Sequence, residues 1–222
     1  MEQIIKFPKI DLNDVKGVLL DLDNTLYHYD SCHIKAITQC YSNYKNHLDI
    51  DISFNDFSTI YRQKRDSVTK RLSPGGACRS RLFAFQEMFE EFDLDNNWEL
   101  AAQYEEIYWS SIIKNMILAK DASIFLKECK KFQIDICIVS DMTANIQIRK
   151  LQKLEVGSYI KYLVTSEEVG SEKPNPNMFK AALNKLNLNA QEVIMIGDSG
   201  SKDIKGAEAL GIKSYKISIE NI

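Results

Sequence analysis

The sequence has few of the features that mark membrane, secreted or zinc-binding proteins. No apolar stretch approaches the ~20 residues that span a bilayer, and the opening segment MEQIIKFPKI has no long apolar run before a cleavage site. The three histidines and five cysteines form neither a CxxC pair nor another zinc-ligand spacing. We therefore expect a cytoplasmic protein with reduced cysteines and no membrane partner.

The sequence also lacks an excess of charge of either sign. It has 28 basic and 31 acidic residues, so its formal net charge is only -3. No global electrostatic field therefore favours a nucleic-acid polymer as partner. With 222 residues, 45% of them hydrophobic, the chain is long enough for one large domain or one domain with an insertion. The composition leaves both a monomer and a homodimer open.

Short apolar runs, typical of buried strands, occur once near the start of the chain and repeatedly near its end. They lie at 15–20, 134–139, 162–165, 193–196 and 214–217. Helical patterns separate the later runs, at 121–131, 143–154, 175–186 and 203–210. This alternation predicts an α/β fold with a Rossmann-like parallel sheet covered on both faces. We expect this core to comprise residues 1–26 and 116–222.

The stretch 27–115 interrupts the alternation and contains only helical patterns. Apolar residues recur there at steps of three and four, as in Ile34, Ile37, Tyr41, Tyr44 and Leu48. The segment Ser73–Gly76, with the sequence SPGG, predicts an exposed loop. We therefore expect an α-helical domain inserted after the first strand of the sheet.

Polar side chains follow four of the expected strands, in chain order. They are Asp21 with Asp23, Ser140, Lys173, and Asp198 with Asp203. Open parallel sheets bind ligands beyond the carboxyl ends of their strands, so these side chains are expected at one edge. Clustered carboxylates without His or Cys favour a hard cation such as Mg²⁺, and Ser, Lys and helix N-termini bind phosphate. The pattern predicts a magnesium-dependent phosphate site.

Four segments carry a resemblance to the ordered motifs of the haloacid dehalogenase superfamily of phosphohydrolases. They are DLDNTLY at 21–27, VSDMT at 139–143, TSEEVGSEKPNPNMF at 165–179 and IGDSGSKDIKGAEALGI at 196–212. The helical insertion also resembles the cap that one subgroup of this superfamily places between the first two motifs. The resemblance implies a Mg²⁺-dependent phosphatase acting on a small soluble phosphomonoester.

The resemblance also implies a role for each motif residue. Asp21 would attack phosphorus and form an aspartyl-phosphate, while Asp23 would protonate the leaving oxygen and then activate water. The metal would bind Asp21, the backbone carbonyl of Asp23 and Asp198. Ser140 and Lys173 would hold the phosphate group and offset its charge.

Two further aspartates are expected beside this set. Asp203 would orient Lys173 or a metal-bound water. Asp141 departs from the family pattern, because relatives more often carry Asn after the serine of the second motif. A carboxylate at the phosphate site would disfavour substrates with negative charge on that side. The alternative is that Asp141 caps the helix that begins near Thr143.

The expected helical insertion carries a basic segment between Arg62 and Arg81. It contains seven basic residues and one acidic residue. One interpretation is a solvated helix face. The other is that Arg71, Arg79 or Arg81 contacts the substrate and sets specificity when the cap closes.

Other activities are compatible with parts of this pattern. A metal-independent dehalogenase is disfavoured because dehalogenases proper lack the second acid, here Asp23. A receiver domain is disfavoured because more than 110 residues separate Asp23 from Ser140. A phosphoryl-transferring mutase of the same fold stays open. A non-catalytic phosphate-binding protein is disfavoured because every position needed for the chemistry carries a competent residue type. A nucleotide and a sugar phosphate both stay open as substrate.

Overall fold

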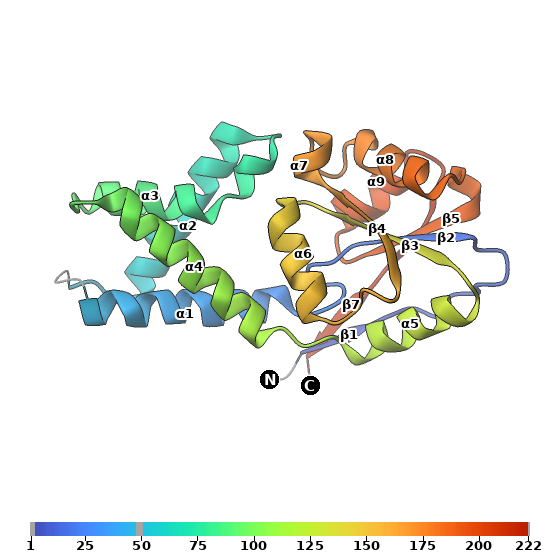
Figure 1. Ribbon diagram of the computed structural model, residues 1–222, viewed down its shortest axis with the longest axis horizontal. Coiled ribbons are helices and arrows are strands. Elements are labelled where there is room, and N and C mark those ends of the chain that lie inside the picture. The colour runs from blue at the N-terminus through green and yellow to red at the C-terminus, as the bar shows by residue number, and fades with distance from the viewer. Residues whose placement is uncertain (1–2, 48–50, 222) are drawn as a thin grey trace. The chain divides into compact units, whose positions relative to one another are not determined.

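The computed structural model describes residues 3–47 and 51–221 (Figure 1). The chain divides into two compact units. The first combines Met1–Tyr29 with Met116–Ile222 and is called the α/β unit below; the second, Asp30–Asn115, is called the helical unit. The helical unit begins at Asp30, whereas the insertion expected from the sequence begins at residue 27.

A five-stranded parallel sheet forms the centre of the α/β unit, in the order β4-β3-β2-β5-β6. Its strands are β2 (Gly17–Leu20), β3 (Asp135–Ser140), β4 (Ile160–Thr165), β5 (Val193–Gly197) and β6 (Lys213–Lys216). Every residue of β2 and β5 is buried, as expected for strands covered on both faces. Figure 1 shows α8 and α9 on one side of this sheet and α5 on the other. The predicted α/β class is confirmed.

The helices of the α/β unit begin and end at residues with clear local signals. They are α5 (Lys120–Lys131), α6 (Ala144–Lys153), α7 (Ser166–Val169), α8 (Pro176–Leu186) and α9 (Lys205–Glu208). In α8, the Asn175 side chain accepts the N–H of Asn177, Pro176 occupies the first turn, and Asn187 ends the helix with φ 55°. The helix predicted at 203–210 begins earlier, because a π-helical turn at Gly200–Ile204 precedes α9.

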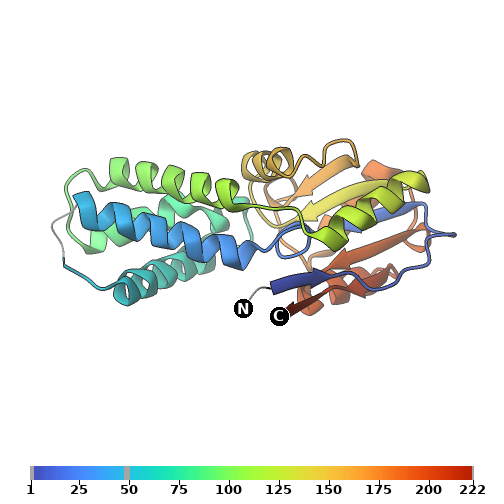
Figure 2. The same ribbon diagram turned by 90° about the horizontal axis from the view of Figure 1, so that it is seen from below.

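A second, two-stranded sheet pairs the ends of the described chain. Strand β1 (Gln3–Lys6) runs antiparallel to β7 (Ser218–Asn221), and Figure 2 shows the two side by side. The sequence analysis did not predict either strand. Each has only four residues, and the pairing joins segments more than 200 residues apart, so no local pattern indicates it.

The helical unit is held together by aromatic side chains. Its elements are α1 (Tyr29–His47), α2 (Phe54–Leu72), a 3₁₀ turn (Gly76–Arg79), α3 (Arg81–Glu91) and α4 (Asn97–Asn115). Ring centroids lie 4.8 Å apart in the pairs Tyr61–Phe85 and Phe89–Tyr104. Ile34, expected on the apolar face of α1, is 62% exposed, and Leu48 lies outside the described residues.

Ser73 and Pro74 are exposed, as expected for the loop after α2. Across the described residues, every helix is too short or too polar to cross a bilayer.

The chain leaves the α/β unit after β2 and returns before α5. The two crossing segments meet within that unit, because the N–H of Ala119 donates to the carbonyl of Leu26 at 2.8 Å. The insertion therefore departs from and returns to nearly the same place on the sheet unit.

Close packing of α9 depends on a glycine. A Cβ atom on Gly206 would lie 2.7 Å from the Phe179 ring and 3.0 Å from Pro174 Cβ. We expect Gly206→Ala to lower the free energy of unfolding by about 1–3 kcal/mol, the range for overpacked cores. Gly157→Ala is the matched control, because nothing lies within 4 Å of its Cβ position. Urea denaturation of both variants tests this, and equal stabilities would contradict it.

Candidate active site

Polar residues gather where the winding of the parallel sheet reverses. From β2 the chain continues to β3 and β4 on one side, whereas β5 and β6 lie on the other. Leu20 pairs with Ile138 of β3 and with Ile196 of β5, so Asp21 comes level with the ends of both neighbours. Ser140 ends β3, and Asp198 directly follows β5. Open parallel sheets bind their ligands at this kind of switch point.

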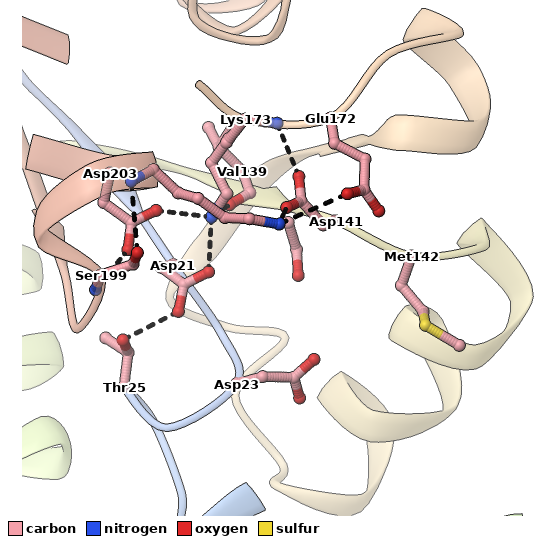
Figure 3. Close-up of polar contacts among 12 residues, drawn as sticks. Asp21, Asp23, Thr25, Val139, Asp141, Met142, Glu172, Lys173, Ser199 and Asp203 are labelled. Atoms are coloured by element: carbon pink, nitrogen blue, oxygen red, sulfur yellow. Dashed lines mark hydrogen bonds and ion pairs between the residues drawn. The ribbon is translucent and has the colours of Figure 1, made fainter. Parts of the chain in front are cut away.

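Lys173 joins three of these strand ends through its ammonium group. Its Nζ donates to Asp21 Oδ1 at 2.6 Å and to the Val139 carbonyl at 2.8 Å, and lies 2.8 Å from Asp203 Oδ1 (Figure 3). Thr25 donates to the other oxygen of Asp21 at 2.9 Å. Asp21, Lys173 and Asp203 are all buried, with exposed fractions of 6%, 4% and 1%. Both Asp21 oxygens are therefore held in place.

Burial governs the charge of this cluster. It raises the pKa of Asp21 to about 8, a shift that Lys173 opposes and that the charges of Asp203 and Asp198 reinforce. Burial alone would lower the pKa of Lys173, but Asp203 and Asp21 raise it well above its ordinary value. Lys173 therefore stays charged, whereas Asp21 needs further positive charge to be fully ionised near neutral pH.

Three carboxylates are placed to share a cation. Asp21, Asp198 and Asp203 each offer an oxygen, and these atoms lie within 4.8 Å of one another. An all-oxygen ligand set suits a hard divalent ion such as Mg²⁺, and a cation there would relieve the repulsion that raises the pKa of Asp21. The residues present thus fit the implied metal. Gly197 lets Asp203 lie against the end of β5, where a Cβ atom would collide with it.

Asp203 has a second partner besides Lys173. Its Oδ2 accepts the backbone N–H of Ser199 at 3.0 Å, and Ser199 also caps the π-helical turn that follows. The resemblance predicts that Asp203 orients Lys173 or a metal-bound water. In the structure Asp203 pairs with Lys173 and is itself one of the three clustered carboxylates.

Asp23 lies in a separate polar environment built by α6. Its carboxylate accepts hydrogen bonds from Lys150 Nζ at 2.8 and 2.9 Å, from Gln147 Nε2 at 3.3 Å, and from the Tyr27 hydroxyl. Burial, the largest single influence, would raise the pKa of Asp23. The Lys150 ammonium and the hydrogen bonds from Lys150, Tyr27 and Gln147 together outweigh burial and hold the pKa of Asp23 below its ordinary value.

Gln147 also reaches the predicted phosphate-binding serine. Its Nε2 donates to Ser140 Oγ at 2.5 Å, so one amide group contacts both Ser140 and Asp23. Neither Gln147 nor Lys150 was predicted from sequence. Their spacing of three residues puts them on one face of α6. Because lysine is rarely buried, the sequence does not indicate that this face packs against the sheet.

Asp141 holds the loop that carries Lys173. Its Oδ1 accepts the backbone N–H of Lys173 at 2.8 Å, and its Oδ2 accepts from Lys202 Nζ at 2.6 Å (Figure 3). The alternative that Asp141 caps α6 is wrong. The N–H of Ala144, the first residue of α6, donates instead to the Glu167 carboxylate at 2.8 Å. Lys202, which the sequence analysis did not consider, offsets the extra negative charge of Asp141.

The three arginines predicted to set specificity have different environments in the helical unit. Arg81 is buried, and its guanidinium lies 5.5 Å over the Tyr108 ring and 5.6 Å over the Trp109 ring. Arg79 is half-buried, and its carbonyl accepts from Arg81 at 3.0 Å. Arg71 is exposed and pairs with Glu87 at 2.6 Å. Arg81 is thus built into the aromatic interior of the unit.

Comparisons with known proteins agree with this geometry. Residues 18–217 match the family model described as haloacid dehalogenase-like hydrolase. The chain is 33% identical to ribulose-1,5-bisphosphate 5-phosphatase from Halopiger xanaduensis, over 89% of this chain and 82% of that protein. It is 24% identical to glyceraldehyde 3-phosphate phosphatase from Pyrococcus furiosus, over 90% and 79%. Its fold is similar to that of a magnesium-bound HAD hydrolase from Bacillus subtilis, with TM-score 0.68, 19% identity and coverage of 90% and 87%.

The raised pKa of Asp21 predicts a pH-dependent stability without metal. Between the ordinary value of 3.8 and about 8, Asp21 keeps its proton in the folded chain and loses it in the unfolded chain. The unfolded state then binds fewer protons, so the free energy of unfolding falls as pH rises through this window. We expect the wild type to lose more stability than Asp21→Asn between about pH 5 and pH 8 in EDTA, measured by urea denaturation.

The exposed carboxylate of Asp14 supplies the control for this measurement. Asp14→Asn should follow the wild-type profile. Parallel profiles for wild type and Asp21→Asn would contradict the assignment of the pKa shift to Asp21.

Proposed function

Because the chain belongs to the haloacid dehalogenase-like hydrolase family and is a hydrolase of phosphomonoesters, we propose that it cleaves a small soluble phosphomonoester with Mg²⁺ through an aspartyl-phosphate on Asp21. The observation that carries this proposal is the environment of Asp21 at the switch point of the sheet. Its carboxylate pairs with the Lys173 cation, and it offers an oxygen within 4.8 Å of oxygens of the Asp198 and Asp203 carboxylates. This arrangement suits a nucleophile that must approach a phosphate dianion.

The first step needs Asp21 ionised and aimed at phosphorus. Lys173 and Thr25 each hold one of its oxygens, and Lys173 also offsets the negative charge that the phosphoryl group brings. Asp21 and Asp198, together with Asp203 or the backbone carbonyl of Asp23, would hold Mg²⁺. The bound ion would supply Lewis-acid neutralisation of the charge on the phosphoryl oxygens. The P–O bond to the leaving group breaks as the bond to Asp21 forms.

Asp23 is the acid/base partner in this proposal. It gives a proton to the leaving oxygen in the first step and takes one from water when the aspartyl-phosphate is hydrolysed. A phosphate dianion beside Asp23 raises the proton affinity of its carboxyl group and so counteracts the effect of Lys150. The Ser140 hydroxyl donates a hydrogen bond to the phosphate. Asp141 acts through the backbone of Lys173, which it holds.

The relatives bear on the substrate class. Ribulose-1,5-bisphosphate 5-phosphatase and glyceraldehyde 3-phosphate phosphatase are named for phosphates of small sugars. We therefore favour a sugar or triose phosphate over a nucleotide, and hydrolysis over phosphoryl transfer by a mutase. A soluble cytoplasmic monomer or homodimer that acts on such a metabolite, without a nucleic-acid partner, suits the balanced charge of the chain.

The helical unit follows β2 in the sequence, and we propose that it serves as the substrate-recognising cap. Of the three predicted arginines, the exposed Arg71, which pairs with Glu87, and the half-buried Arg79 are our candidates for contacts beyond the phosphoryl group. Arg81 has a structural role in this proposal, because its guanidinium packs on the rings of Tyr108 and Trp109.

Hydrolysis of a panel of sugar, triose and nucleotide monophosphates tests the proposed reaction. We expect turnover with Mg²⁺ and none with EDTA. Asp21→Asn should abolish turnover because an amide is no nucleophile, and Asp23→Asn should slow it by about 10²- to 10⁴-fold. Asp14→Asn is the control and should keep wild-type rates. Full activity in EDTA, or a labelled phosphoryl group trapped on a residue other than Asp21, would contradict the mechanism.

Single alanine variants test the cap. Arg71→Ala and Arg79→Ala should lower kcat/KM for the best substrate of the panel by about 1–3 kcal/mol, the range for a hydrogen bond to a charged group. A small aryl phosphate lacks the contacted part and should be hydrolysed almost unchanged. Arg81→Ala should instead lower the melting temperature. If Arg71→Ala and Arg79→Ala slow both substrates equally, or slow neither, these arginines do not set specificity.

A further inference from the structure

We propose that Lys150 is a positioning residue for Asp23, and that Gln147 ties this acid/base to Ser140, so that α6 sets the geometry on the leaving-group side of the site. The inference rests on the proposed function, because it requires Asp23 to exchange a proton with the leaving oxygen. It goes beyond that function by assigning roles to two residues outside the four motif segments.

The Lys150 ammonium is enclosed around the Asp23 carboxylate. Lys150 has no exposed surface, and its Nζ contacts both carboxylate oxygens, at 2.8 and 2.9 Å. The ring centroids of Tyr29 and Tyr27 lie 5.4 and 6.0 Å from the same nitrogen. The Tyr27 hydroxyl donates to Asp23 Oδ1. A carboxylate held by donors on both oxygens cannot rotate freely about its side-chain bonds.

Stability alone does not account for a lysine at this position. Lys150 lies on the buried face of α6 with Ile146, where an apolar side chain would pack without a buried charge. Replacing a buried ion pair by well-packed apolar groups is often neutral or stabilising. A residue that offers no clear gain in stability, yet contacts the acid/base group directly, points to a role in the reaction.

The Gln147 amide leads to the same conclusion. Its Nε2 has two N–H groups, which reach Asp23 Oδ2 at 3.3 Å and Ser140 Oγ at 2.5 Å. Its Oε1 is buried and accepts no hydrogen bond from the part of the chain that the structure describes. A buried carbonyl without a donor costs stability. The amide therefore fixes the separation between the Ser140 hydroxyl and the Asp23 carboxyl. It does so although its unpaired carbonyl lowers the free energy of unfolding.

Proton transfer depends strongly on this geometry. Asp23 must present an oxygen to the leaving group within hydrogen-bond distance while Ser140 holds the phosphoryl group. A displacement of about 1 Å in a reacting group can slow a reaction by roughly 10²-fold. Removal of the Lys150 contact should therefore impair the step in which the leaving oxygen takes up a proton, and leave binding of the phosphate group largely intact.

The test compares Lys150→Met with Lys153→Met, a matched control at an exposed lysine of the same helix. Each is assayed with Mg²⁺ on an alkyl phosphate, whose leaving group needs a proton, and on 2,4-dinitrophenyl phosphate, whose leaving group departs without one. We expect Lys150→Met to lower kcat for the alkyl phosphate by about 10- to 100-fold with little change in KM. The burst of dinitrophenolate, which reports the first step alone, should change less than about threefold. Lys153→Met should match the wild type on both substrates.

A double variant tests whether Lys150 acts through Asp23. Asp23→Asn/Lys150→Met should be no slower on the alkyl phosphate than Asp23→Asn alone, because the group that Lys150 positions is already disabled. Gln147→Leu provides a second variant and should also slow the alkyl phosphate more than the dinitrophenyl burst. Equal losses on both substrates, or additive losses in the double variant, would overturn the inference while the proposed function stands. A wild type that hydrolyses neither ester would refute both.

Discussion

The ammonium group of Lys173 is the interaction on which the rest of the site depends. It lies between the Asp21 and Asp203 carboxylates and also donates to the carbonyl of Val139 within β3. Asp141 holds the backbone of the same lysine. These contacts connect segments that follow β2, β3 and β5. A buried charge is tolerated only when it is paired, so the carboxylates and the lysine require one another for the fold as well as for chemistry.

Asp21 and Asp23 are separated by a single residue, yet their pKa values are shifted in opposite directions. Burial raises the pKa of Asp21 to about 8, whereas at Asp23 the combined effect of Lys150, Tyr27 and Gln147 exceeds that of burial and holds the pKa below its ordinary value. The proposed first step needs the reverse, an ionised Asp21 and a protonated Asp23. A cation among Asp21, Asp198 and Asp203 would favour the first change, and a phosphate dianion beside Asp23 would favour the second. In the proposed mechanism, metal and substrate would therefore together create the reactive protonation states.

Most of the sheet and the positions of the motif residues could be predicted from sequence. Strands β2 to β6 are short apolar runs separated by helical patterns, and parallel strands bring the residues after them to one edge. The β1–β7 pair, the Lys202–Asp141 contact and the Asp23 environment could not. They depend on contacts between distant segments, and a buried lysine such as Lys150 has no apolar signature. The motif positions are therefore readable from their places after strands, whereas the contacts of Lys150, Gln147 and Lys202 are not.

The hydrogen bond from Ala119 to Leu26 has a consequence for how this fold can change. This hydrogen bond joins, beside β2, the segment that enters the helical unit to the segment that leaves it. The α/β unit therefore holds the two ends of the insertion together without contacts from the inserted residues. An insertion at such a junction can lengthen, shorten or be exchanged without altering strand register. Because loop-closure entropy grows only slowly with length, the thermodynamic penalty for such exchanges is small. If the helical unit selects substrates, as proposed, substrate selection can change during evolution without altering the α/β unit that holds the reacting groups.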